Sequence, residues 1–259
     1  MKYIKLFENF DRSSIVDICK KYRIYNYTIN DDGSIDVNGD VDLSGKKLHA
    51  LPLKFGKVTG DFYCTTNQLT SLENSPTYVG GSFIVGDNKL VDLEDCPTYI
   101  GGAFDCCHNQ LTSLNGCPTS INRYFNCGVN KLTNLIGCPS TIGEHFHCFY
   151  NNLTSFDGSP TYVGGLFKCD DNKFKTLLGF NTDVKGRFIT KSKLDIIYDI
   201  LKNNIECIPN FYDFHILDNL DDDKPTLNLK RLNRFIELYD LEPLTEELSN
   251  EIKKYYIVI

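Results

Sequence analysis

The sequence predicts an α/β solenoid, a stack of short parallel strands with a helical segment at each end. The first observation is a period of 21 residues between six phenylalanines. The second is an asparagine five residues after each of them. The third is that this period ends before the last quarter of the chain, where apolar residues recur at helical spacing instead. The six phenylalanines are Phe62, Phe83, Phe104, Phe125, Phe146 and Phe167.

Each repeat follows the template F-x-C-x-x-N-x-L-x-x-L. One such unit cannot bury its own apolar side, so neighbouring units stack and share a core. The F-x-C segment predicts a short strand with Phe and Cys pointing inward and the residue between them outward. The solenoid is therefore expected over residues 39–190, including a degenerate first unit and an incomplete last one that begins at Phe188.

The two ends predict different caps, because an open solenoid would expose its core. Residues 1–38 are expected to form an N-terminal cap, with a helix over Ser13–Tyr22 and a hairpin that turns at Asp32-Gly33.

Residues 191–259 are expected to form a C-terminal α-helical cap. Its helices are predicted over Lys193–Lys202, after a capping Asn228, and from Thr245 to Tyr255. Residues 218–225 are expected to be an acidic linker between helical pieces.

The template resembles the leucine-rich repeat, L-x-L-x-x-N-x-L-x-x-L, with Phe and Cys in the two leading apolar positions. The resemblance covers Gly39 to Phe188 and implies one parallel β-sheet on a concave side, an irregular convex side, and an internal ladder of asparagine amides that satisfies backbone groups. Units such as "NQLTSL" and "CPTYIGG", and the opening "KLFENF", are similar to proteins encoded by tailed bacteriophages. A 21-residue period also suits one coil of a parallel β-helix, which is the alternative fold.

The chain has eleven cysteines, and those at the repeated positions are interpreted as core residues with free thiols. Val85 occupies the position that cysteine holds in the other units, so the position requires a small apolar residue rather than a thiol. Cys107 and His108 depart from this pattern at outward positions, nearly two repeats from His145 and His147. No metal site and no cofactor are expected, because a zinc site needs about four converging ligands.

Charge and hydropathy limit the classes of partner. The net charge of −7 gives no basic face for nucleic acid. No apolar run approaches the ~18 residues that a membrane span requires. No membrane or nucleic-acid partner is therefore expected. The odd cysteine count, the length of the chain and the absence of a visible export signal indicate a protein of a reducing cytosol.

An aromatic and imidazole cluster on the exposed sheet is the predicted binding site. Leucine-rich repeats commonly bind through the outward residues of the concave sheet, and aromatic side chains are favoured at interface hot spots. The cluster and its flanking residues are Tyr124, Asn126, His145, His147, Phe149, Tyr150 and Lys168. The alternative is that the C-terminal cap folds over this surface and buries it.

These observations favour a non-enzymatic protein-protein interaction module. Resemblance to phage proteins suggests a host protein, including a defence protein, or a viral protein as the partner, and the host cytoplasm as the location. A virion-associated or internal structural protein is the alternative. A weak protease-site pattern at Leu6-Phe7-Glu8 favours this alternative. An effector-like enzyme is the third hypothesis, and its only candidate nucleophile in the C-terminal region is Cys207.

Overall fold

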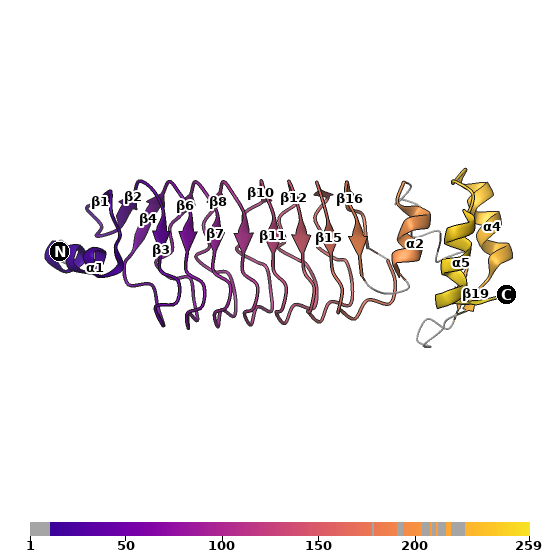
Figure 1. Ribbon diagram of the computed structural model, residues 1–259, viewed down its shortest axis with the longest axis horizontal. Helices are drawn as coiled ribbons and strands as arrows, with labels where there is room; N and C mark the ends of the chain where they lie inside the picture. Colours follow the sequence, from indigo (N-terminus) through magenta and orange to yellow (C-terminus); the bar gives the residue numbers. More distant parts are fainter. Residues whose placement is uncertain are drawn as a thin grey trace, which may run out of the picture.

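The computed structural model describes residues 11–177, 179–190, 194–203, 208, 211, 216–218 and 226–259. They form a parallel β-solenoid with a helix and hairpin at one end and a helical segment at the other (Figure 1). The predicted solenoid is thereby confirmed. Cys207, most of the acidic linker and the "KLFENF" opening lie outside the described residues.

One strand of every unit joins a single eight-stranded sheet. Each strand pairs in parallel with the strand one repeat away, so that Phe104 lies opposite Phe83 and Phe125. Residues that are 21 positions apart in the sequence are therefore paired with one another in the sheet. Its strands are β3 (Val41–Asp42), β5 (Phe62–Tyr63), β7 (Phe83–Ile84), β9 (Phe104–Asp105), β11 (Phe125–Asn126), β13 (Phe146–His147), β15 (Phe167–Lys168) and β17 (Phe188–Ile189).

A second row of strands runs beside the first, where the sequence predicted an irregular side. Each ends on a Val or Ile, which is buried in every strand but the last, where Val184 is half-buried; three residues then lead into the next strand of the first row. Backbones of successive turns approach closely here: a Cβ on Gly101 would lie 2.2 Å from the Gly80 carbonyl oxygen. Two strand rows per coil are a feature of the β-helix alternative. The row comprises β4 (Phe55–Val58), β6 (Tyr78–Val79), β8 (Tyr99–Ile100), β10 (Ser120–Ile121), β12 (Thr141–Ile142), β14 (Tyr162–Val163) and β16 (Asp183–Val184).

The core consists of columns of equivalent side chains. The six repeated phenylalanines are fully buried, and ring centroids of neighbours lie 4.8 to 5.6 Å apart, close to the spacing of parallel strands. Val85 and the cysteines that share its position are equally buried, as the packing interpretation predicted. These positions are Cys64, Cys106, Cys127, Cys148 and Cys169.

An asparagine ladder holds successive turns together, as the resemblance implied. Asn130 is representative: its Oδ1 accepts the Leu111 N–H at 2.9 Å, and its Nδ2 donates to the carbonyls of Cys106 and Cys127. The same pattern recurs at Asn67, Asn88, Asn109, Asn151 and Asn172. The amides thus satisfy backbone groups that the turning chain would otherwise leave unpaired in the interior.

The N-terminal cap has the predicted parts. Helix α1 (Arg12–Tyr22) begins after Asp11, whose side chain accepts the Ser13 N–H. Strands β1 (Tyr27–Ile29) and β2 (Ile35–Val37) form the antiparallel hairpin. Strand β2 then pairs in parallel with β4, so the hairpin extends the second strand row.

The C-terminal part contains the three expected helices: α2 (Leu194–Leu201), α4 (Leu229–Leu238) and α5 (Glu246–Tyr255). Asn228 and Thr245 cap α4 and α5 through their side-chain oxygens. Tyr198 of α2 packs on Phe188, with ring centroids 4.5 Å apart, and so closes the core of the solenoid.

A small sheet in this part was not predicted. Strands β18 (Leu217–Asp218), β19 (Thr226–Leu227) and β20 (Ile257–Val258) pair in that order. Each strand has only two residues, too few to show an alternating pattern in the sequence.

Candidate protein-binding face

Three adjacent strands position the predicted site. The outward residues of β11, β13 and β15 are Asn126, His147 and Lys168, and they lie opposite one another in register. Because Phe and Cys point inward on each strand, the residue between them projects from the sheet. The sequence pattern therefore placed these three side chains on one face correctly.

Phe149 is the centre of the cluster that forms there. The ring centroids of His147 and Phe149 lie 6.1 Å apart, and those of Phe149 and Tyr150 lie 6.0 Å apart at 80°. The His145 and His147 rings are parallel with centroids 6.2 Å apart. Tyr150 remains 57% exposed. We call His145, His147, Phe149, Tyr150 and Lys168 the aromatic patch.

Gly128 determines how Phe149 lies. A Cβ on Gly128 would come within 2.9 Å of the Phe149 ring. The ring therefore rests directly on the backbone of the preceding turn. This contact was not predicted, although a glycine one repeat before an outward aromatic residue was the available signal in the sequence.

Lys168 holds the other side of the Phe149 ring. Its Nζ lies 4.5 Å from the ring centroid, within the range of a cation–π interaction. The same Nζ lies 3.7 Å from Asp170 Oδ1, and Asp170 is only 1% exposed. Lys168 is thus oriented by two neighbours, so its charge has a defined place on the face.

The two histidines have different roles. His145 Nδ1 accepts the Leu166 N–H at 2.9 Å, a role that Asp61 fills for the Ser82 N–H in an earlier turn. His147 Nε2 is buried and has no hydrogen-bond partner among the described residues. Burial, then His145 and Lys168, lower the pKa of His147 below its ordinary value of 6.5, so His147 is neutral at neutral pH.

Tyr124 and Asn126 form the flank of the patch. Asn126 Oδ1 accepts the Gly128 N–H, and its Nδ2 donates to Asp105 Oδ2 at 3.1 Å. Burial, then Asp105, raise the pKa of the half-buried Tyr124. Both polar groups of the Asn126 side chain thus form hydrogen bonds within the protein. The aromatic patch is therefore the part of the predicted site with more groups free to contact a partner.

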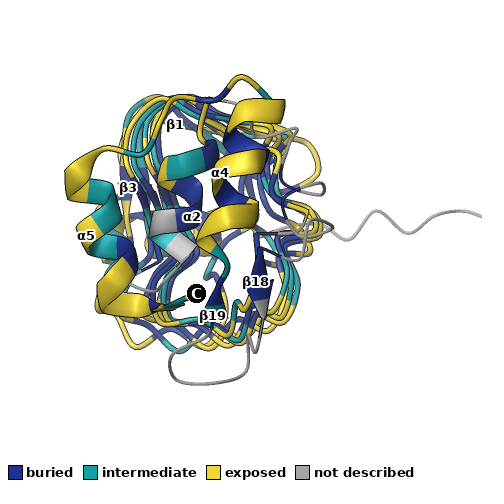
Figure 2. Cartoon of the chain, turned by 90° about the vertical axis from the view of Figure 1, so that its right-hand side faces the viewer, coloured by how far each residue is buried: buried dark blue, intermediate teal, exposed yellow. Residues whose placement is uncertain are grey.

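The described helices leave this face uncovered. Helices α2, α4 and α5 extend the solenoid at its end and do not lie across the eight-stranded sheet (Figure 1). Viewed down the axis, the coils superpose closely, so the array is straight and the expected concave surface is a flat face (Figure 2). The alternative in which the C-terminal part buries the patch is not what the described residues adopt.

The thiols and imidazoles form no metal centre in the described part of the chain, where no three His, Cys, Asp or Glu side chains are grouped to hold an ion. Ten described cysteines are free. Burial raises the pKa of the Cys106 and Cys148 thiols well above the ordinary value, which keeps them protonated and unreactive.

Comparison with known proteins adds no assignment: no family model matches the chain, and no curated protein matches it. Among the described helices, none is long and apolar enough to cross a membrane.

Proposed function

We propose that the chain is a non-enzymatic protein-protein interaction module that binds its partner through the aromatic patch. The observation that carries this proposal is a set of partly exposed aromatic and imidazole rings on a flat, uncovered sheet face. Monomeric proteins rarely expose such a group without use.

The rigidity of the face supports the same function. Neighbouring turns are joined by ladder hydrogen bonds, and Phe149 is fixed between Gly128 and Lys168. A partner that binds these rings therefore immobilises few additional side-chain rotors, which reduces the entropic cost of association.

Resemblance to the leucine-rich repeats of tailed bacteriophages supplies the proposed biological setting. In this setting the module belongs to a phage, acts in the host cytoplasm and binds a host protein, including a defence protein. Both the family membership and this setting are inferred from sequence resemblance. A virion-associated role is the second candidate, and detection of the chain by mass spectrometry of purified particles would favour it.

The test is an affinity pull-down from host lysate with the full chain, followed by measurement of the dissociation constant for the purified partner. The variant His147→Ala/Phe149→Ala/Tyr150→Ala removes the centre of the patch. Loss of a hot spot costs ~2 kcal/mol or more, so the dissociation constant should rise about 30-fold or more.

Tyr99→Ala is the matched control, because Tyr99 is an exposed aromatic residue on the second strand row, 46% exposed and stacked on Tyr78. It should retain the partner fully. If the triple variant binds as tightly as the wild type while its unfolding midpoint falls, the patch is a packing feature and the proposal is wrong.

A further inference from the structure

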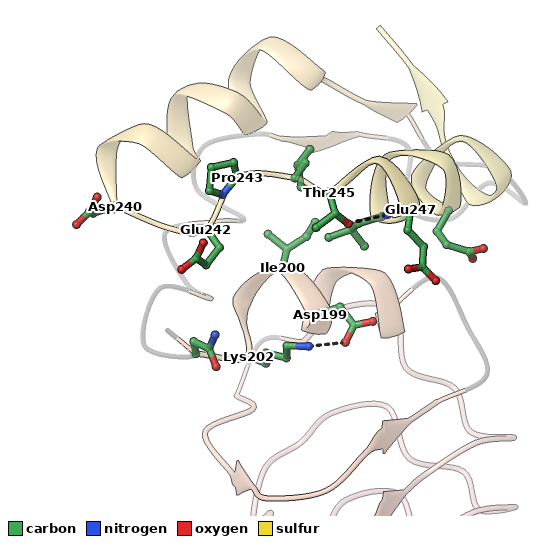
Figure 3. Close-up of a pocket in the computed structure, with 12 residues that line it drawn as sticks. Asp199, Ile200, Lys202, Asp240, Glu242, Pro243, Thr245 and Glu247 are labelled. Carbon is green, nitrogen blue, oxygen red and sulfur yellow. Dashed lines mark hydrogen bonds and ion pairs between the residues drawn. The ribbon is translucent and has the colours of Figure 1, made fainter.

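The C-terminal part contains a second surface that the sheet face does not explain. A groove of 510 Å³ lies between α2 and the segment that joins α4 to α5 (Figure 3). Its apolar lining consists of Ile200 from α2, Pro243 and Leu244 from the connection, and Leu248 from α5. Pro243 is exposed and the other three are half-buried, so apolar surface remains accessible in the groove.

Acidic side chains line the groove beside these apolar residues. Asp199, Asp240, Glu242, Glu247 and Glu251 line the groove, and Lys202 is the one basic side chain among the described lining residues. The groove therefore carries a formal charge of −4, from five carboxylates and one ammonium group.

Only part of this charge is compensated within the described chain. Lys202 Nζ lies 3.5 Å from Asp199 Oδ1, and Lys254 pairs with Glu251. Asp240, Glu242 and Glu247 form no ion pair with the described residues. Glu247 lies in the first turn of α5, where the helix dipole accounts for a negative charge. Asp240 follows the end of α4 with a φ of 51°, a left-handed conformation that aspartate tolerates, whereas Glu242 has no such explanation.

The arrangement does not fit a metal ion. Within the described chain these carboxylates do not form a group of three placed to coordinate one cation. They share the groove with apolar side chains instead, a pattern that matches a ligand carrying both apolar side chains and positive charges.

We propose that this groove binds a basic amphipathic segment of a partner protein. Apolar side chains of that segment would cover Ile200, Leu244 and Leu248, and its lysines or arginines would face Glu242 and Asp240. Charge complementarity selects a basic segment over an acidic one and increases its association rate at low ionic strength. The site is independent of the aromatic patch, since it lies beyond the end of the eight-stranded sheet (Figure 1).

The test uses a fluorescent synthetic peptide in which pairs of leucines alternate with pairs of lysines, titrated with the full chain and followed by fluorescence anisotropy. A peptide with glutamate in place of every lysine is the ligand control. We expect saturable binding of the lysine peptide that weakens as salt is raised, and no binding of the glutamate peptide.

Two protein variants locate the binding. Glu242→Lys should weaken binding of the lysine peptide by about fivefold or more, because an attraction becomes a repulsion. Glu73→Lys, a charge reversal at an exposed residue of the solenoid, is the matched control and should change the affinity by less than about twofold.

Three results overturn the proposal. They are the absence of saturable binding below about 1 mM peptide, equal binding of both peptides, and equal weakening by Glu242→Lys and Glu73→Lys. The aromatic-patch triple variant should bind the lysine peptide as the wild type does, so failure at this site and failure at the sheet face are distinguishable.

Discussion

Replacement of Asn130 by alanine tests whether the asparagine ladder stabilises the solenoid. Asn130 lies in a central turn, and its side chain is 8% exposed. Its Oδ1 accepts a hydrogen bond from the Leu111 N–H. Its Nδ2 donates to the carbonyls of Cys106, Cys127 and Gly128 at 3.1 to 3.2 Å.

The size of the change in the free energy of unfolding depends on which backbone groups lose their last hydrogen-bond partner. The Cys106 carbonyl keeps a bond from Asn109, and the Cys127 carbonyl keeps one from Asn151. The Leu111 N–H is left buried without its acceptor, which costs about 1–3 kcal/mol. The three lost carbonyl bonds, each about 0.5–1.5 kcal/mol in net terms, bring the sum to about 2.5–7.5 kcal/mol. Because the Cys106 and Cys127 carbonyls keep other donors, Asn130→Ala should lower the free energy of unfolding by an amount near the lower limit, about 2.5–4 kcal/mol.

Urea unfolding followed by far-UV circular dichroism measures this change, since the chain has no tryptophan. The control is Asn115→Ala, an exposed asparagine of the neighbouring turn, which should stay within about 0.5 kcal/mol of the wild type. If Asn130→Ala is equally mild, the ladder contributes little stability and the reasoning is refuted.

Three further substitutions test the core, the backbone and the patch. Cys106→Val should change the free energy of unfolding by less than about 1 kcal/mol, because Val85 fills the equivalent position of the neighbouring repeat. Cys106→Ser should lower it by about 1–3 kcal/mol, because it buries a hydroxyl group. Equal urea midpoints for the two variants would contradict the packing interpretation. Val129 has a φ of 55°, a conformation that is strained for a β-branched residue but that asparagine tolerates. Val129→Asn should therefore raise the thermal unfolding midpoint by the equivalent of about 0.5–1 kcal/mol. A lower midpoint would show that packing of the valine side chain dominates. The lowered pKa of His147 means that the unfolded chain takes up a proton near pH 6.5 before the folded chain does, so its contribution to stability is present above that pH and is lost toward acid pH. His147→Gln should therefore lose less stability than the wild type between about pH 7.5 and about pH 5.5, measured by urea titration at each pH, and parallel curves would argue against a perturbed His147.

Much of the solenoid follows from local pattern. A phenylalanine column with a 21-residue period can be buried only if each unit pairs in register with the next, so the period alone requires parallel strands. The helix that begins after Asn228 was also predictable, because capping depends on residues within one turn.

The second strand row was harder to predict. Apart from β4, its strands have two residues and carry one recurring side chain, such as Val79 or Ile100, so neither alternation nor length distinguishes them from a bend. Their pairing depends on how closely successive turns approach, a property of the stacked coils rather than of one unit.

The sequence by itself determined the repeat, the inward columns and the outward position of His147 and Lys168, because each depends on alternation within a strand. Tertiary structure alone decided that Phe149 rests on Gly128 beneath Lys168, that the C-terminal helices leave this face open, and that an acidic groove forms between α2 and α5. These contacts join residues of different turns or helices. Their geometry depends on how whole elements pack together, and a local sequence pattern does not predict that packing.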